Sequence, residues 1–239
     1  MSICSESILL RSKHVDMYRR LRTSELFRML QEASIRHTEQ LGMGRDKTLD
    51  KGILWVLLMQ RAEIARMPEY DEQIVLKTWP GKTMHLLFPR YAAVETASGE
   101  PLLKVSALWT LVDAETRKVV FPEKYGVEIE GVTTGGEIQM PGSVKKAACD
   151  HGQDFTVPFS FVDINGHMNN TRYFDLADDC IGAAESGALL TEIAAEYQNE
   201  ARLGETLHLN WGQEEPGTYF LCGETGRDVF RMRLKYRIP

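Results

Sequence analysis

The sequence predicts an α+β fold in which one unit, a helix wrapped by an antiparallel β-sheet, occurs twice in tandem. Two segments of helical periodicity are each followed by a series of strand-like segments, and a stretch rich in Gly, Thr and Ser lies between the two sets. Two helices are too few to supply the crossover connections that a parallel sheet would need between its strands. The repeated order therefore favours a duplicated antiparallel unit over a parallel α/β fold.

The first unit is predicted to cover residues 1–126. Its helix, expected over 24–41, follows the cap-forming pair Thr23 and Ser24, repeats apolar side chains at helical spacing and ends near Gly42. The strand segments after it begin with an apolar run short enough for a buried strand and end with apolar side chains that alternate on one face. They are expected at 53–59, 73–79, 88–95 and 102–112.

The second unit, residues 153–239, is predicted to follow a linker over 127–152, because that stretch has few large apolar residues. Its helix, expected over 171–186, begins after a run of cap-forming side chains and ends at Gly187. The strands after this helix are expected at 193–201, 206–211, 217–224 and 229–238.

Composition and charge exclude several classes of protein. The formal net charge of -6 argues against a general nucleic-acid binder, because phosphate binding needs an excess of Lys and Arg. No apolar run approaches the ~20 residues that span a bilayer, so we expect no membrane insertion. The N-terminus has no basic region before its short apolar stretch, which is atypical of signal and transit peptides. We therefore expect a cytoplasmic protein.

The cysteines point to the same compartment. The chain has 4 of them, widely spaced and without a CxxC pair: Cys4, Cys149, Cys180 and Cys222. This pattern indicates neither a zinc site nor a disulfide framework, and reduced thiols fit a cytosolic protein.

The segment between Phe161 and Asn170, just before the second helix, carries the candidate chemistry. Asp163, Asn165 and His167 are spaced by two, which in an extended chain places all three side chains on one side. The free N–H groups of the helix start lie nearby and can stabilise an oxyanion. A carboxylate, an amide and an imidazole here can orient a water molecule or attack an acyl carbon. The alternative is that these residues only cap and turn the chain.

A second segment, Glu196-Tyr197-x-x-Glu200, is expected on the strand after that helix, ahead of a hairpin turn at 203–204. Together with Asp163-x-Asn165-x-His167-Met-Asn-Asn it resembles the acyl-ACP thioesterase family of plants and bacteria. The N-terminal half is also similar to that family, in Gly52-Ile-Leu-Trp55-Val, Val105-Ser-Ala-Leu-Trp109 and Asp113-x-x-Thr116-Arg117. The likeness extends from about Thr23 to the C-terminus.

The resemblance implies a tandem (double) hot-dog fold, with much of the acyl-chain pocket in the first unit and catalysis in the second. It implies hydrolysis of the fatty acyl thioester of acyl carrier protein, an acidic partner, to release free fatty acid in fatty acid synthesis. The family's catalytic residues fall on Asp163, Asn165, His167 and Glu200. No cofactor is implied, and the spacing of these side chains matches no zinc signature, so we expect no metal.

Plant members of the family often have a cysteine after the catalytic glutamate, where this chain has Ala201. A cysteine nucleophile is therefore absent at this position, and carboxylate chemistry remains. We favour Glu200 as general base, with Asp163 attacking the acyl carbon or sharing the base role. Asn165 then positions Asp163 or the thioester oxygen, and His167 tunes the carboxylates. The sequence does not choose between an acyl-enzyme anhydride and direct attack by water.

Other interpretations stay open at this point. The chain is alternatively a hot-dog acyl-CoA thioesterase, or a non-catalytic module that binds an acyl chain or a carrier protein. The sequence fixes neither chain length nor saturation preference, nor whether the protein is a monomer or a homodimer. Alternating basic residues on the last strand indicate either a solvated face or a docking surface for the carrier: Arg231, Arg233, Lys235 and Arg237. Basic residues at 19–22 and 145–146 are equally possible docking sites.

Overall fold

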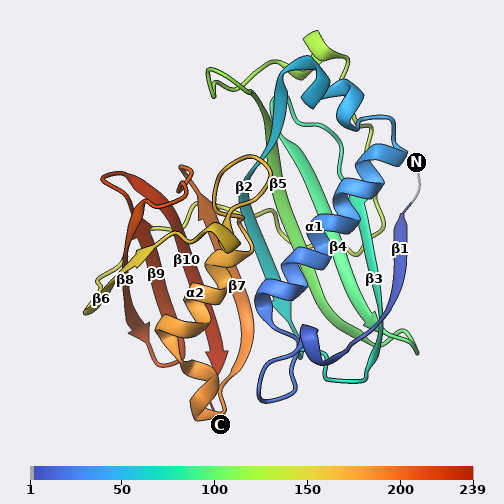
Figure 1. Ribbon diagram of the computed structural model, residues 1–239. Helices are drawn as coiled ribbons and strands as arrows, with labels where there is room; N and C mark the ends of the chain where they lie inside the picture. Colours follow the sequence, from blue (N-terminus) through green and yellow to red (C-terminus); the bar gives the residue numbers. More distant parts are fainter. Residues whose placement is uncertain (1–2, 239) are drawn as a thin grey trace.

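The computed structural model describes residues 3–238, which form ten strands in a single sheet and two α-helices on one side of it (Figure 1). The strand order is β1-β3-β4-β5-β2-β7-β10-β9-β8-β6, and every neighbouring pair is antiparallel. The predicted α+β fold with antiparallel strands is confirmed. Residues 1, 2 and 239, at the ends of the two predicted units, lie outside the described residues.

The first half contains the longer helix, α1 (Thr23–Gln40), close to the predicted 24–41. This helix buries Leu26, Phe27, Leu30 and Ala33, whose spacing places them on one face against the sheet. The strands of this half are β1 (Cys4–Leu9), β2 (Ile53–Ile64), β3 (Gln73–Pro80), β4 (Phe88–Thr96) and β5 (Pro101–Asp113). Strand β1 was not predicted.

The second half repeats this arrangement with a shorter helix, α2 (Arg172–Ile181). It ends earlier than predicted because Gly182 adopts a left-handed conformation (φ 61°), and a short 3-10 turn, Ala183–Ser186, follows. The strands are β6 (His151–Thr156), β7 (Leu189–Tyr197), β8 (Thr206–Glu215), β9 (Thr218–Glu224) and β10 (Asp228–Arg237). The prediction of a strand over 193–201 was wrong by four residues at each end, and β6 was not predicted.

The two halves are joined edge to edge by β2 and β7, which pair antiparallel from Met59↔Glu196 to Glu63↔Glu192. The Gln60 side-chain amide donates a hydrogen bond to the buried Tyr197 hydroxyl across this junction. The sheet is continuous across this junction, so it gives no boundary between the two predicted units. The residue bounds of these units stay a prediction.

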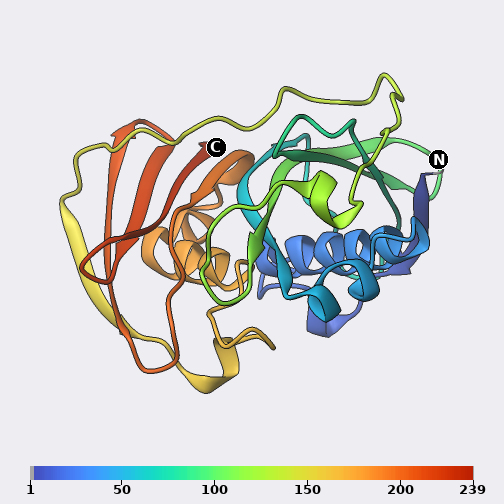
Figure 2. The ribbon, with the colours of Figure 1, turned by 90° about the horizontal axis from the view of Figure 1, so that it is seen from above.

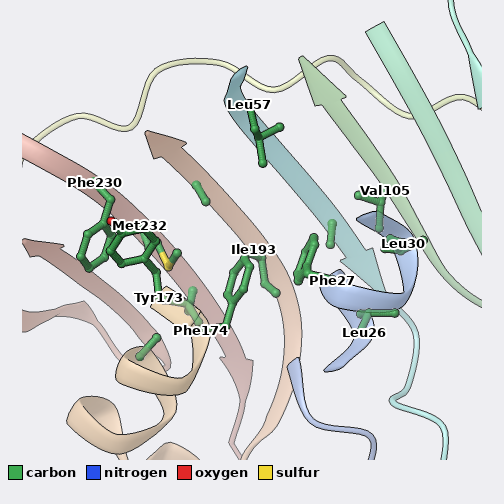
Figure 3. Packing of buried hydrophobic residues seen from close by; sticks show 14 of the residues in the cluster. Leu26, Phe27, Leu30, Leu57, Val105, Tyr173, Phe174, Ile193, Phe230 and Met232 are labelled. Carbon is green, nitrogen blue, oxygen red and sulfur yellow. The ribbon is translucent and has the colours of Figure 1, made fainter. Parts of the chain in front are cut away.

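The main hydrophobic core is also shared by both halves. Phe27 of α1 stacks on Phe174 of α2, with ring centroids 4.2 Å apart and an interplanar angle of 11°. Figure 3 shows this pair together with Tyr173 and Phe230, whose ring centroids are 4.4 Å apart. The two helices therefore pack on each other as well as on the sheet, and neither half buries its helix alone.

The segment between β5 and β6 crosses the face of the sheet opposite the helices (Figure 2). We call residues 127–150 the linker segment. It is held at several points, including a hydrogen bond from the Val144 N–H to Glu196 Oε2 (2.8 Å) and one from the Ser106 hydroxyl to the Gln139 carbonyl (2.8 Å). Val144 is buried against Phe220. The segment is thus packed along the sheet rather than extended into solvent.

No helix within residues 3–238 has both the length and the apolar character needed to cross a membrane.

Candidate active site

The segment that carries Asp163, Asn165 and His167 forms a tight turn. The Gly166 N–H donates to the Asp163 carbonyl (3.0 Å), and the Asp163 N–H donates to the His167 carbonyl (2.9 Å). Asp163 Oδ1 accepts a hydrogen bond from the Asn165 N–H (2.8 Å), an interaction by which Asp commonly reverses a chain. The expectation of an extended segment with three side chains on one side was therefore wrong, because Asp163 closes its own turn.

The turn separates the three predicted site residues. His167 is buried, with 8% of its surface exposed, and Asp163 is half-buried. Asn165 lies at the exposed tip, next to Ile164, which is 94% exposed. Asp163 thus has a structural role, as the alternative interpretation holds, and its second carboxylate oxygen remains available for chemistry. The catalytic roles of these residues stay a prediction.

Glu200 reaches His167 from the loop between β7 and β8, and not from a strand as predicted. The outgoing arm of the turn pairs with this loop: the Met168 N–H donates to the Ala201 carbonyl (2.8 Å), and His167 forms a β-bridge with Arg202. The chain then reverses at 203–204, as predicted, with Gly204 at φ 78°. This pairing leaves His167 Nε2 and Glu200 Oε2 3.0 Å apart.

Arg117, a residue that the sequence did not single out as functional, contacts the other oxygen of the same carboxylate. Its Nη1 lies 3.4 Å from Glu200 Oε1. Arg117 follows β5 in the first half and adopts a left-handed conformation (φ 58°). The Asp113 carboxylate holds this turn, because its Oδ1 accepts from the N–H of Thr116 (2.7 Å) and from its hydroxyl (2.8 Å). The Asp113-x-x-Thr116-Arg117 pattern was a signal in the sequence, but nothing in it indicated a partner in the second half.

Burial of His167 favours its neutral form. Burial lowers the pKa of this histidine, Glu200 and Asp163 act to raise it, and Arg117 and Arg202 act to lower it further. With its pKa below the usual value of 6.5, the imidazole is neutral at pH 7, and its Nε2 lies 3.0 Å from Glu200 Oε2. The Glu200 carboxylate therefore lies between an imidazole at one oxygen and a guanidinium at the other.

The thiols are poorly suited to be nucleophiles. Burial raises the pKa of Cys180 to about 11 and that of Cys222 to about 12, and it also raises the pKa of Cys149. A thiol with such a pKa is protonated at neutral pH, and the thiolate is the reactive form. Ala201, at the position where plant relatives often have cysteine, is fully buried. These observations favour carboxylate chemistry.

A cavity lies between α1 and the sheet of the first half and reaches the start of α2 at Asn170 and Thr171, shortly after His167 in the chain. The space between the lining residues is partly open to solvent. The lining is mainly apolar and also includes several polar side chains. The apolar residues include Phe27, Leu30, Leu57, Val105 and Trp109, and the polar ones include Gln31, Ser34, Gln60, Thr78, Arg90, Asn170 and Thr171. Of the buried run 53–59, only Leu57 contributes.

Two family models match consecutive parts of the chain: the acyl-ACP thioesterase N-terminal domain over residues 3–141 and the C-terminal domain over residues 144–237. Among curated proteins, the chain is 21% identical over 255 residues to acyl-[acyl-carrier-protein] hydrolase FATB2, chloroplastic, of Cuphea viscosissima, covering 97% of this chain and 62% of that protein. It is 23% identical over 235 residues to dodecanoyl-[acyl-carrier-protein] hydrolase, chloroplastic, of Cinnamomum camphora, covering 87% of this chain and 60% of that protein. The chain therefore spans about three fifths of the length of these relatives.

Two solved structures have the same fold over almost the entire chain. An acyl-ACP thioesterase from Bacteroides thetaiotaomicron superposes with a TM-score of 0.84 at 21% identity, covering 98% of both chains. The 12:0-ACP thioesterase from Umbellularia californica superposes with a TM-score of 0.82 at 18% identity, covering 99% of this chain and 98% of that one. The tandem hot-dog fold is thereby confirmed, and with both family models matched in order the chain belongs to the acyl-ACP thioesterase family.

Proposed function

We propose that this protein hydrolyses the thioester of fatty acyl chains carried by acyl carrier protein and releases free fatty acid for fatty acid synthesis. The observation that carries the proposal is the Glu200 carboxylate, held between His167 (3.0 Å) and Arg117 (3.4 Å) in a chain of this family. A cavity with a mainly apolar lining, suited to an acyl chain, reaches Asn170 and Thr171, shortly after His167 in the chain. The cytoplasmic location is proposed from composition alone.

In the proposed reaction Glu200 acts as general base on a water molecule. The water oxygen attacks the thioester carbonyl carbon, its proton passes to Glu200, the carbon–sulfur bond breaks, and the proton is then transferred to the leaving thiolate. His167 and Arg117 orient the carboxylate. Asp163 is the weaker candidate for the base, because its Oδ1 already accepts the Asn165 N–H. Attack by Asp163 through its second oxygen is the alternative route.

Replacing Arg117 with Ala is expected to lower kcat by about 5-fold, the upper end for loss of a partly exposed ion pair. The acid limb of the pH–rate profile should also move to higher pH, because the guanidinium acts to lower the pKa of His167 and its removal lets that pKa rise. Arg117→Lys, which keeps the charge, should retain most of the original profile.

The exposed neighbour Lys118 provides the matched control, since Lys118→Ala removes a charge from the same turn. An acid limb that stays in place in Arg117→Ala, or that moves equally in Lys118→Ala, would show that Arg117 does not act through His167.

The substrate is tested with acyl carrier proteins bearing chains of C4 to C18 and the matched CoA esters. We expect kcat/KM to be much higher for the carrier esters. KM for them should rise with salt, because attraction between charged surfaces is screened over ~8–10 Å at physiological ionic strength. Equal efficiency on CoA esters, unaffected by salt, would instead assign the acyl-CoA thioesterase function.

The basic row on β10 is a poor candidate for docking the carrier. Three of its four side chains already pair with carboxylates: Arg231 with Asp228, Arg233 with Glu214, and Lys235 with Glu192. Arg202 and Arg227 are exposed and lie next to the candidate site, Arg227 Nη2 being 3.4 Å from the Glu200 carbonyl oxygen. We place the docking surface at Arg202 and Arg227, where an acidic carrier can deliver its thioester to Glu200.

A further inference from the structure

Arg90 of β4 is a buried cation in the wall of the cavity, with 7% of its surface exposed. Its Nη1 donates to Thr78 Oγ1 (3.2 Å) and to His37 Nδ1 (3.3 Å), and its Nη2 donates to Thr38 Oγ1 (2.9 Å). All three acceptors are neutral groups, because a guanidinium can only donate and the accepting ring nitrogen of His37 must be unprotonated.

No carboxylate of residues 3–238 lies within ion-pair distance of this guanidinium. Burial lowers the pKa of Arg90 to about 10, so the side chain still carries its charge at neutral pH. Burying a charge without a counter-ion raises the free energy of the folded protein. The three contacts above use three of the five N–H groups, and two donors are left for a ligand in the cavity.

The lining of the cavity changes character along α1. Phe27 and Leu30 lie at the end where α1 meets α2. Gln31 and Ser34 follow toward the helix C-terminus, and Ser34 is about 10 Å from Phe27 along the axis at 1.5 Å per residue. Arg90, bonded to the still later Thr38, stands at this polar end. Arg90 therefore stands in the cavity wall away from the contact between α1 and α2 at Phe27, while the start of α2 contributes the polar side chains of Asn170 and Thr171.

We propose that the cavity binds an acyl chain whose far end carries a carboxylate, with Arg90 as its counter-ion. The hydrocarbon part then lies against Phe27 and Leu30, and the terminal carboxylate accepts the two remaining N–H groups of Arg90. A methyl-terminated chain would leave the guanidinium desolvated and uncompensated. This substrate class rests on the proposed thioesterase function and narrows it.

The experiment compares ω-carboxyacyl and methyl-terminated acyl carrier proteins of equal length, C6 to C14, with the wild type, Arg90→Met and Arg90→Gln. At the chain length that the wild type hydrolyses most efficiently, its kcat/KM should be at least about 10-fold higher for the ω-carboxy ester than for the methyl-terminated ester. This is the usual scale for a charge-assisted contact. Both variants should lose that preference while still hydrolysing the methyl-terminated ester. Arg36→Met, which removes an exposed arginine of α1 outside the cavity, should keep it.

An unchanged preference in both variants would overturn the proposal, as would a wild type that favours methyl-terminated chains at every length. Arg90→Gln keeps hydrogen-bonding capacity toward Thr38 and Thr78, and serves if the Met variant does not fold.

Ligand-induced shifts in Tm separate this proposal from the proposed activity. Dodecanedioic acid should raise the Tm of the wild type more than dodecanoic acid does, and this difference should vanish in Arg90→Met. If no ester is hydrolysed but the difference is present, the thioesterase function fails and the carboxylate subsite stands. If methyl-terminated esters are hydrolysed and the difference is absent, the subsite fails and the function stands.

Discussion

Replacing Glu200 with Gln is expected to lower kcat by about 10²-fold or more, the usual contribution of a general base. The amide has nearly the shape of the carboxylate, and its single oxygen can face either His167 or Arg117, so the fold should persist. Only the capacity to take a proton from water is removed. Steady-state and single-turnover hydrolysis of an acyl carrier protein ester measures the effect, with circular dichroism to verify folding.

Asp163→Asn is the companion variant that compares the two carboxylates. Asn can still accept the Asn165 N–H through its side-chain oxygen, so the turn survives. A loss of similar size in Asp163→Asn would mean that this carboxylate also takes part in the chemistry, while a small loss would assign the base to Glu200 alone. Replacing Cys149, Cys180 and Cys222 together should leave hydrolysis intact. Near wild-type turnover in Glu200→Gln, or an inactive but folded variant with these three cysteines replaced, would contradict the carboxylate mechanism.

The second large effect concerns stability: Phe174→Ala should reduce the free energy of unfolding by about 3–5 kcal/mol, the usual cost of truncating a buried Phe. Phe174 is fully buried and its ring stacks on Phe27 at 4.2 Å, so the substitution opens a void where the two helices meet. Domains of ordinary stability unfold with about 5–15 kcal/mol, and the variant should lose a large part of that. Urea denaturation followed by fluorescence measures the change.

Phe159→Ala is the control, because Phe159 is 82% exposed and such surface substitutions usually change stability by less than about 0.5 kcal/mol. Since the core is shared, wild type and variant should each unfold in one transition. A change below about 1 kcal/mol in Phe174→Ala, or two separate transitions in the wild type, would show that the helices do not stabilise one another.

Most elements of the fold could be predicted from local patterns. The bounds of α1, β3, β4 and β5 fall within about two residues of those predicted, because their apolar periodicity is strong. The missed strands, β1 and β6, are the two edges of the sheet. Each pairs on one side only and is largely polar, so neither has the apolar alternation of a buried strand. The sheet partner, and not the local sequence, fixes their conformation.

Only part of the candidate site could be predicted from local sequence patterns. The motifs around His167 and Glu200 lie in one half and follow each other closely, so their association could be predicted. The conformation of residues 163–167 could not be predicted, because Asp163 closes a turn where the spacing by two suggests an extended chain. Arg117 joins the site only through packing of one half against the other. Contacts of this kind leave no periodic signal in the sequence.

The linker segment makes the meeting of the two halves an intramolecular event. Because the two halves are parts of one chain, their association does not depend on the concentration of the protein. Here β2 and β7 contribute five residue pairs. A cut in the linker segment would leave His167 and Glu200 on one fragment and Arg117 with most of the cavity on the other. Reconstitution of the site would then follow second-order kinetics in the two fragments.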